Sequence, residues 1–268
     1  MKLRWLANYG PAFVLVVALL ALWELASRAD LSLAQFLPTP SSIVRALALN
    51  WDAIYTNTIP TLLETVIGMF VATALGLLLA VLIDFSGWSR RAIYPLLVIS
   101  QTIPIVALAP LLLIWGGFGL GPKVVVVTLY CFFPIAVATA DGLASAEPDL
   151  IKLLKSMKAS HWQILWLVRL PGAMPAFFSG LRIAATYSVT GAIVAEFVGA
   201  YQGLGIYMET STNSHAIPVV FATIVITAVL SLALFALVNV IEHLALPWYY
   251  TSRLPLHEAL ASGKTHWH

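Results

Sequence analysis

The 268-residue chain is 60% hydrophobic and only 10% charged, with a mean hydropathy of +0.92. A soluble domain of this length could not bury so much apolar surface, so the composition indicates an integral membrane protein. The net charge of +2 is too small to suggest nucleic-acid binding, and the single cysteine, Cys131, excludes a disulfide framework and a thiolate metal site.

Six apolar segments are long enough to cross a bilayer as helices. A transmembrane helix needs about 20 residues, and the candidates are 9–28, 58–83, 92–115, 122–141, 176–198 and 217–246. The first contains a core like that of a signal peptide, but no cleavage site follows it, so we predict a retained helix. The expected domains are an N-terminal helix with an interfacial segment (1–58), a transmembrane domain (59–250) with a long loop (142–176), and a cytoplasmic tail (251–268).

The basic residues are distributed unequally between the two sides of the predicted membrane domain. With the N-terminus inside, the cytoplasmic segments hold Lys2, Arg4, Arg90, Arg91, Lys152, Lys155, Lys158, Arg169, Arg253 and Lys264. The outer segments hold only Arg28, Arg45 and Lys123. Because cytoplasmic loops carry an excess of Lys and Arg, both termini are predicted to lie in the cytoplasm.

The third apolar segment contains polar residues and prolines. Gln101, Thr102 and Pro104 could open the helix and expose polar groups to a transport pathway. Alternatively, Pro104 and Pro110 are ordinary kinks whose freed backbone groups are satisfied by neighbouring helices.

The loop at 142–176 contains a short amphipathic helix. Pro148 suits its first turn, and Asp149 suits the positive end of the helix dipole. The apolar residues that follow have helical spacing. They form one predicted apolar face: Leu150, Leu153, Leu154 and Met157.

A second short helix is predicted from Trp162 to Leu170. Ser160 and Gln163 form a capping-box pattern at its start, and Pro171 and Pro175 are expected to stop it before the fifth span. The loop is therefore a helix, a turn and a helix at the cytoplasmic face. By physics alone it is either a docking element for another protein or a basic hairpin resting on anionic lipid.

The fifth apolar segment carries several hydroxyl groups and one carboxylate. Thr186, Tyr187, Ser188 and Thr190 form a polar patch that either lines a pathway or packs helices together. Glu196 is costly to place in lipid and should therefore face protein or water. We favour a structural or gating hydrogen bond for Glu196 over contact with a substrate.

No catalytic site is predicted. The spans place no Ser/His/Asp set and no pair of metal ligands on one helix face. The sequence Gly263-Lys264-Thr265 resembles a phosphate loop, but the required upstream glycine is replaced by Glu258. The chain is therefore not expected to be an enzyme or to bind a metal or a cofactor.

The loop resembles the Glu-Ala-Ala loop of ATP-binding-cassette (ABC) importer permeases. The matching segments are LLKSMKAS, WQILWLVRLP and GAMP. The Glu-Ala-Ala positions fall on Lys152, Leu153 and Leu154, and the family's turn glycine falls on Lys158. This last departure matters because a non-glycine residue at positive φ costs of order 1 kcal/mol.

Other segments resemble the nitrate, sulfonate, taurine and pyrimidine-precursor branch of the same family. They are LPTPSSIVRAL, SQTIPIVALAPLLLIWGGFGLG and GLRIAATYSVTGAIVAEFVGAYQGLG, which together cover most of residues 37–210. Within this branch, FFPIAVATADGL and AEFVGAYQGLG look most similar to permeases for thiamine-precursor pyrimidines and for riboflavin.

The resemblance implies an all-α integral membrane protein with the six transmembrane helices of a type I ABC importer permease, located in the cell inner membrane. It implies an ATPase subunit dimer that binds ATP and Mg, a solute-binding protein outside, and a second copy of the permease, since one chain supplies half a pathway. The ATPase would be contacted by Leu150, Lys152, Leu153, Leu154, Lys155, Met157, Lys158, Ala159 and Trp162. The expected substrate is a small heteroaromatic vitamin precursor, with sulfonate, taurine or nitrate as alternatives.

A different class of function is a stand-alone secondary transporter. That class predicts an ion-coordinating site at the midplane and broken helices in paired repeats. Neither is evident in the sequence, and the structured basic loop would then lack a purpose.

Overall fold

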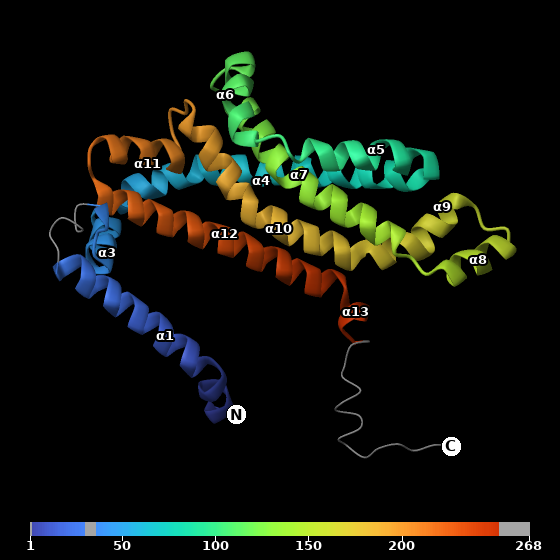
Figure 1. Cartoon of the computed structure of the whole chain (residues 1–268), viewed down its shortest axis with the longest axis horizontal. Helices are drawn as coiled ribbons and strands as arrows, with labels where there is room; N and C mark the ends of the chain where they lie inside the picture. Colours follow the sequence, from blue (N-terminus) through green and yellow to red (C-terminus); the bar gives the residue numbers. More distant parts are fainter. Residues whose placement is uncertain (1, 30–35, 252–268) are drawn as a thin grey trace.

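The computed structural model describes residues 2–29 and 36–251, and all regular structure in these ranges is helical (Figure 1). This confirms the all-α class. The elements in chain order are α1 (Lys2–Ala29), α3 (Pro40–Leu49), α4 (Trp51–Phe85), α5 (Gly87–Ser100), α6 (Ile105–Gly116), α7 (Leu120–Ala144), α8 (Pro148–Ser156), α9 (His161–Ile164), the π-helix η1 (Leu165–Arg169), α10 (Leu170–Phe197), α11 (Leu204–Asn213), α12 (Ile217–Ala245) and α13 (Pro247–Thr251). The predicted tail lies outside the described residues, apart from its first residue, Thr251.

Within the described ranges, five helices are long and apolar enough to span a membrane, or six if α5 and α6 count as one broken span. The predicted third span is not a continuous helix, because α5 and α6 meet at an angle of 91°. The break at residues 101–104 ends in Pro104, which lacks an N–H group and disfavours helical backbone at the residue before it. The second span also begins earlier than predicted, at Trp51, and continues through Pro60.

The centre of the bundle is formed by α4, α7 and α10, with α12 packed against α10. Small residues allow these helices to approach closely, as is common in membrane proteins. At Gly180 of α10, a Cβ atom would lie only 2.6 Å from the backbone oxygen of Pro134 in α7. At Gly68 of α4, a Cβ atom would lie 2.5 Å from side-chain atoms of Val127. The core is therefore tightly packed along α7.

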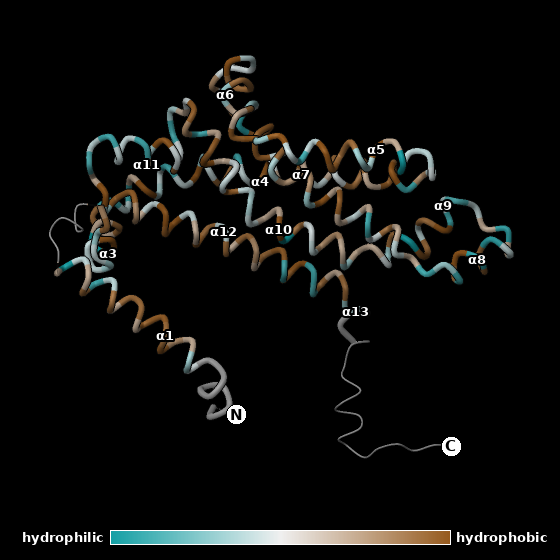
Figure 2. Tube along the Cα trace, viewed as in Figure 1, coloured by the Kyte–Doolittle hydropathy of each residue, from teal (hydrophilic) through white to brown (hydrophobic). Residues whose placement is uncertain are grey.

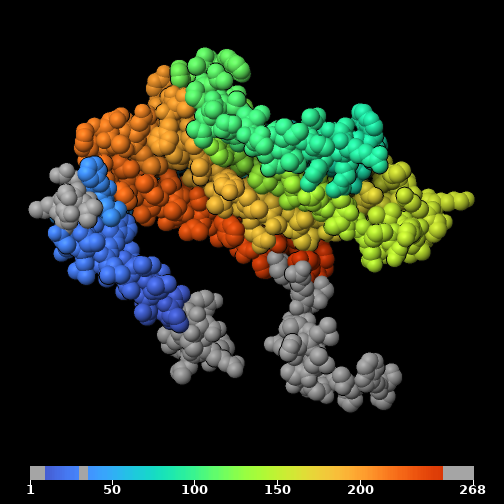
Figure 3. All heavy atoms as spheres, in the orientation of Figure 1, coloured from blue at the N-terminus to red at the C-terminus, as the bar shows by residue number. Residues whose placement is uncertain are grey.

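The elongated bundle has two distinct ends (Figure 1). One end carries α8, α9 and the connection from α4 to α5, and is called the α8 end below. The other carries α3 and α11 and is called the α11 end. In the space-filling view, α8 and α9 protrude beyond the bundle at the α8 end (Figure 3).

The first helix, α1, contacts α3 and diverges from the bundle (Figure 1). Near its C-terminal end, Trp23 packs against Phe221 of α12, with ring centroids 6.2 Å apart. Most of the remaining described surface of α1 is apolar and exposed, including Phe13, Leu19 and Leu22 (Figure 2). Such a surface suits contact with lipid or with another transmembrane helix.

Candidate functional site

The α8 helix has well-formed ends and a largely exposed surface. Pro148 occupies its first turn and Asp149 lies beside it, as predicted, while Lys155 lies in the last turn. The helix buries none of its side chains. The expected apolar face is divided: Leu150, Leu153 and Met157 are exposed, whereas Leu154 is half-buried. The exposed part is the surface available to a partner.

The turn after α8 has the geometry of a glycine C-cap, but it contains a lysine. Lys158 has a φ of 61°, in the left-handed region. Its N–H group donates to the oxygen of Lys155, and the N–H group of Ala159 donates to the oxygen of Leu154 at 2.9 Å. These are the two hydrogen bonds of a Schellman motif, in which glycine usually occupies the left-handed position. Lys158 therefore occupies the left-handed position at which a Schellman motif usually has glycine.

The second helix of the loop starts as predicted but does not stop as predicted. Ser160 and Gln163 form both hydrogen bonds of a capping box at the start of α9. However, the predicted stop at Pro171 and Pro175 is wrong, because α9, η1 and α10 form one continuous helical path, His161–Phe197. Pro171 is the second residue of α10, so the wider turn of η1 precedes the proline in this continuous path. The loop is thus connected rigidly to the fifth span.

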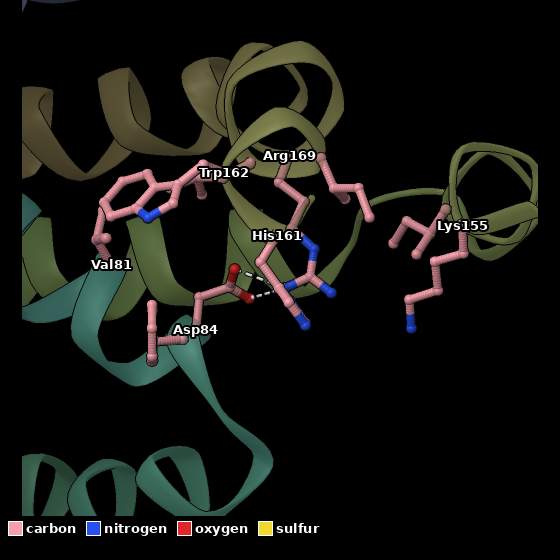
Figure 4. A pocket seen from close by; sticks show the side chains of 10 residues that line it. Val81, Asp84, Lys155, His161, Trp162 and Arg169 are labelled. Atoms are coloured by element: carbon pink, nitrogen blue, oxygen red, sulfur yellow. Dashed lines mark hydrogen bonds and ion pairs between the residues drawn. The ribbon is translucent and has the colours of Figure 1, made fainter. Parts of the chain in front are cut away.

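Below the loop, side chains from α4, α8, α9 and η1 line a cavity of about 50 Å³ (Figure 4). Lys155 and Trp162, both predicted partner contacts, come together at this cavity. Arg169 of η1 reaches Asp84 near the end of α4, and its Nη1 atom donates to both carboxylate oxygens at 2.6 Å (Figure 4). Nothing in the sequence paired these two residues, which lie 85 positions apart.

The predicted pathway residues are divided between two uncovered polar regions. Gln101 and Thr102 lie at the break between α5 and α6 and are exposed. Tyr187 and Thr190 are exposed on α10, and Thr190 also lines an open groove of about 370 Å³ between α10, α11 and α12. Irregular backbone and polar side chains at membrane depth normally face protein or water. Both regions are therefore candidates for a pathway or for an interface between copies.

Glu196 is not on either region but is fully buried at the α11 end of α10. Its Oε1 atom accepts a hydrogen bond of 2.6 Å from the Thr61 hydroxyl group of α4. Its Oε2 atom accepts one of 2.5 Å from the backbone N–H group of Gly205. Through these contacts the carboxylate connects α4, α10 and the start of α11, and the structural or gating role remains a prediction.

The pairing of the residues beside Glu196 was not predicted from the sequence. Lys123, counted above in an outer segment, is buried in the first turn of α7, and its Nζ atom lies 2.7 Å from Oε1 of Glu64 in α4. Glu64 lies one helical turn after Thr61 in α4, so this ion pair stands beside the contacts of Glu196. A carboxylate in a predicted span was the one available signal, because such a group requires a partner. These residues, Thr61, Glu64, Lys123 and Glu196, are called the α11-end polar network below.

The described residues contain no group of three or more His, Cys, Asp or Glu side chains placed to hold a metal ion. The arrangement instead provides an exposed α8–α9 loop at one end, uncovered polar surface along the bundle and a buried polar network at the other end.

Comparisons with known proteins agree with this arrangement. Residues 72–245 match the family model described as "Binding-protein-dependent transport system inner membrane component". The chain is similar to the formylaminopyrimidine transport permease protein ThiX of Halalkalibacterium halodurans, with 38% identity over 86% of this chain and 92% of the relative. It is also similar to the taurine transport system permease protein TauC of Escherichia coli, with 27% identity over 87% of this chain and 88% of the relative.

Among solved structures, the inward-facing MetNI methionine ABC transporter matches with a TM-score of 0.60 and 22% identity, over 77% of this chain and 97% of the matched chain. At that identity the match supports the fold alone, and the fold is that of a type I ABC importer permease. The chain therefore belongs to the family of binding-protein-dependent transport system inner membrane components, the permeases of ABC importers.

Proposed function

We propose that this permease imports a pyrimidine precursor of thiamine, or a related heteroaromatic vitamin compound, with energy from a separate ATPase subunit. The 38% identity to a formylaminopyrimidine permease along most of both chains supports this substrate class. The taurine permease is less similar, at 27% identity, so sulfonates are the second candidate. Family membership favours an ATP-driven importer over a stand-alone secondary transporter.

The α8 end is proposed to lie in the cytoplasm and to receive the ATPase. The single observation that carries this proposal is the geometry of α8: a capped amphipathic helix that buries none of its own side chains. Its exposed apolar side chains include Leu153, at 56% exposure, and Met157, at 69%. Apolar residues on a rigid, protruding helix are the usual anchors of a helix that docks in a groove. The basic residues Arg90, Lys152 and Arg169 at the same end agree with the positive-inside rule.

Two copies of the chain are proposed to surround the pathway, and a solute-binding protein is proposed to deliver substrate at the α11 end. The uncovered polar residues Tyr187 and Thr190 on α10, and Gln101 and Thr102 at the helix break, support a pairing of this kind. In lipid these groups would be poorly satisfied. Between two copies they would face protein or a water-filled path.

The test is uptake of radiolabelled formylaminopyrimidine into proteoliposomes that contain the permease, its copurified ATPase and a solute-binding protein. Uptake should require ATP hydrolysis and should persist when an ionophore removes proton and sodium gradients. Taurine at equal concentration serves as the substrate control and should not compete. Uptake that continues without nucleotide and collapses with the ionophore would contradict the proposed energy source, and competition by taurine would contradict the substrate class.

A further inference from the structure

The ion pair between Asp84 and Arg169 occupies a special place in the fold. Asp84 lies near the end of α4, and its side chain is only 10% exposed. Arg169 is the last residue of η1, which joins α9 to α10, and its side chain is 28% exposed. A charge-assisted contact to both carboxylate oxygens is stronger and more directional than a neutral hydrogen bond. Removing one partner of such a partly buried pair leaves the other charge poorly compensated.

The pair fixes the loop to α4 where the helical path is least regular. A π-helix has wider turns than an α-helix and is common at functional sites. Leu165, the first residue of η1, packs in the core beside Ile83 of α4 and Leu143 of α7. Arg169, at the other end of η1, is held by Asp84. A displacement of α9 is therefore transmitted to α4 through side chains as well as to α10 through the backbone.

The other half of α4 is fastened to the segment that follows α10. The Thr61 hydroxyl group donates to Glu196 and accepts from the backbone N–H group of Leu204 at 2.9 Å. Asn57 accepts from the backbone N–H group of Gly203 at 2.9 Å. From Thr61 to Asp84, α4 is about 35 Å long at the usual rise per residue. Both ends of this rigid helix are thus tied to segments that flank α10.

We propose that Asp84 and Arg169 are a positioning pair that makes α4 move with the α8–α9 loop, so that displacement of the loop reaches the α11-end polar network. This rests on the proposed function, in which the ATPase contacts the loop. Coupling between distant sites needs rigid elements joined by contacts that both sites bias. At the α8 end, the pair of Asp84 and Arg169 joins α4 to the loop. At the α11 end, the α11-end polar network joins α4 to α10 and to the segment that follows α10.

The experiment separates ATPase binding from transmission. Thr190→Cys, in a Cys131→Ser background, reports access to the pathway through labelling by a membrane-impermeant maleimide, with and without ATP and vanadate. The variants are Asp84→Asn, Arg169→Gln and the charge swap Asp84→Arg with Arg169→Asp. The matched control is Asp141→Asn, because Asp141 is 53% exposed and pairs with Arg90 at 3.6 Å at the same end.

Asp84→Asn and Arg169→Gln should copurify with the ATPase as the parent does, yet show a nucleotide-dependent change in labelling that is at least fivefold smaller. The charge swap should restore at least half of the change, and Asp141→Asn should respond like the parent. The inference fails if Asp84→Asn keeps the nucleotide-dependent change in labelling of the parent. It also fails if ATPase binding by this variant falls by the same factor as the change in labelling. A parent protein that neither binds the ATPase nor changes its labelling overturns the proposed function and this inference with it.

Discussion

At the scale of single residues, Lys158 shows how a local backbone requirement persists when the side chain changes. Its φ of 61° and the two hydrogen bonds of the Schellman motif define a position that suits glycine. A left-handed conformation costs a non-glycine residue roughly 1–2 kcal/mol. The turn is therefore set by α8 and by the capping box at Ser160, and the lysine is accommodated at a cost.

Replacing this lysine should stabilise the protein. Lys158→Gly relieves the left-handed strain and should raise the free energy of unfolding by about 1 kcal/mol, less the added entropy of the unfolded glycine. The control Ser156→Gly places glycine in the last turn of α8, where it should lower stability. Thermal unfolding in detergent measures both. Equal destabilisation by the two substitutions would show that the turn does not require a left-handed residue.

Glu196 is expected to matter through the two hydrogen bonds that it accepts. Glu196→Gln keeps the shape, but an amide NH₂ group cannot accept one of the two hydrogen bonds that Thr61 and Gly205 donate. A buried donor left without its acceptor costs about 1–3 kcal/mol. Uptake should therefore fall at least several-fold, while copurification with the ATPase remains unchanged. Parent-level uptake would mean that the side chain serves packing alone.

At the scale of elements, the close approach between α7 and α10 depends on small residues, and Gly180 is the most tightly placed glycine between them. Gly180→Ala would place a Cβ atom 2.6 Å from the Pro134 oxygen, so the helices must separate, at a typical cost of about 1–3 kcal/mol. Gly172→Ala is a matched control in the same helix, because its Cβ would meet nothing within 4 Å and alanine favours helix. The melting temperature should be lower than that of the parent for Gly180→Ala, and equal or higher for Gly172→Ala. The reverse order would refute this packing.

The elements also show what the sequence can predict. The start of α8 and the capping box depend on local spacing, and both were predicted correctly. The predicted six spans correspond to five long helices and the bent pair of α5 and α6. The continuation through Pro171 was not predicted, because a proline in the first turn of a helix looks the same in sequence as one that ends it. The 91° bend after Ser100 was suggested by Pro104, but its angle depends on tertiary packing.

Contacts between distant segments could not be predicted from one sequence. Lys123 seemed to belong to an outer connection, and its burial against Glu64 follows from how α4 and α7 pack. The pair of Asp84 and Arg169 has the same origin. The sequence therefore predicted the separate segments of the candidate site. The polar contacts that join those segments became visible only in the folded structure.

At the scale of the whole molecule, the described helices form an elongated bundle with the α8–α9 loop at one end and the α11-end polar network at the other (Figure 1). The long helix α4 connects the two. This arrangement suits a permease whose pathway is controlled from a distant ATPase, because rigid helices transmit a displacement without requiring the ATPase to reach the pathway. The central claim is that the exposed apolar side chains of α8 are what the ATPase binds.

The most direct test of that claim is pull-down of the ATPase by the double variant Leu153→Ala with Met157→Ala, together with ATP hydrolysis in proteoliposomes. Truncating buried interface anchors typically costs more than 1 kcal/mol each, so ATPase binding should fall at least tenfold and ATP hydrolysis should fall with it. The control Lys152→Ala should change binding little, because Lys152 is 76% exposed and pairs with Asp149 at the surface. If the double variant keeps full binding and ATP hydrolysis, the α8–α9 loop is a hairpin on the lipid surface and the central claim is wrong.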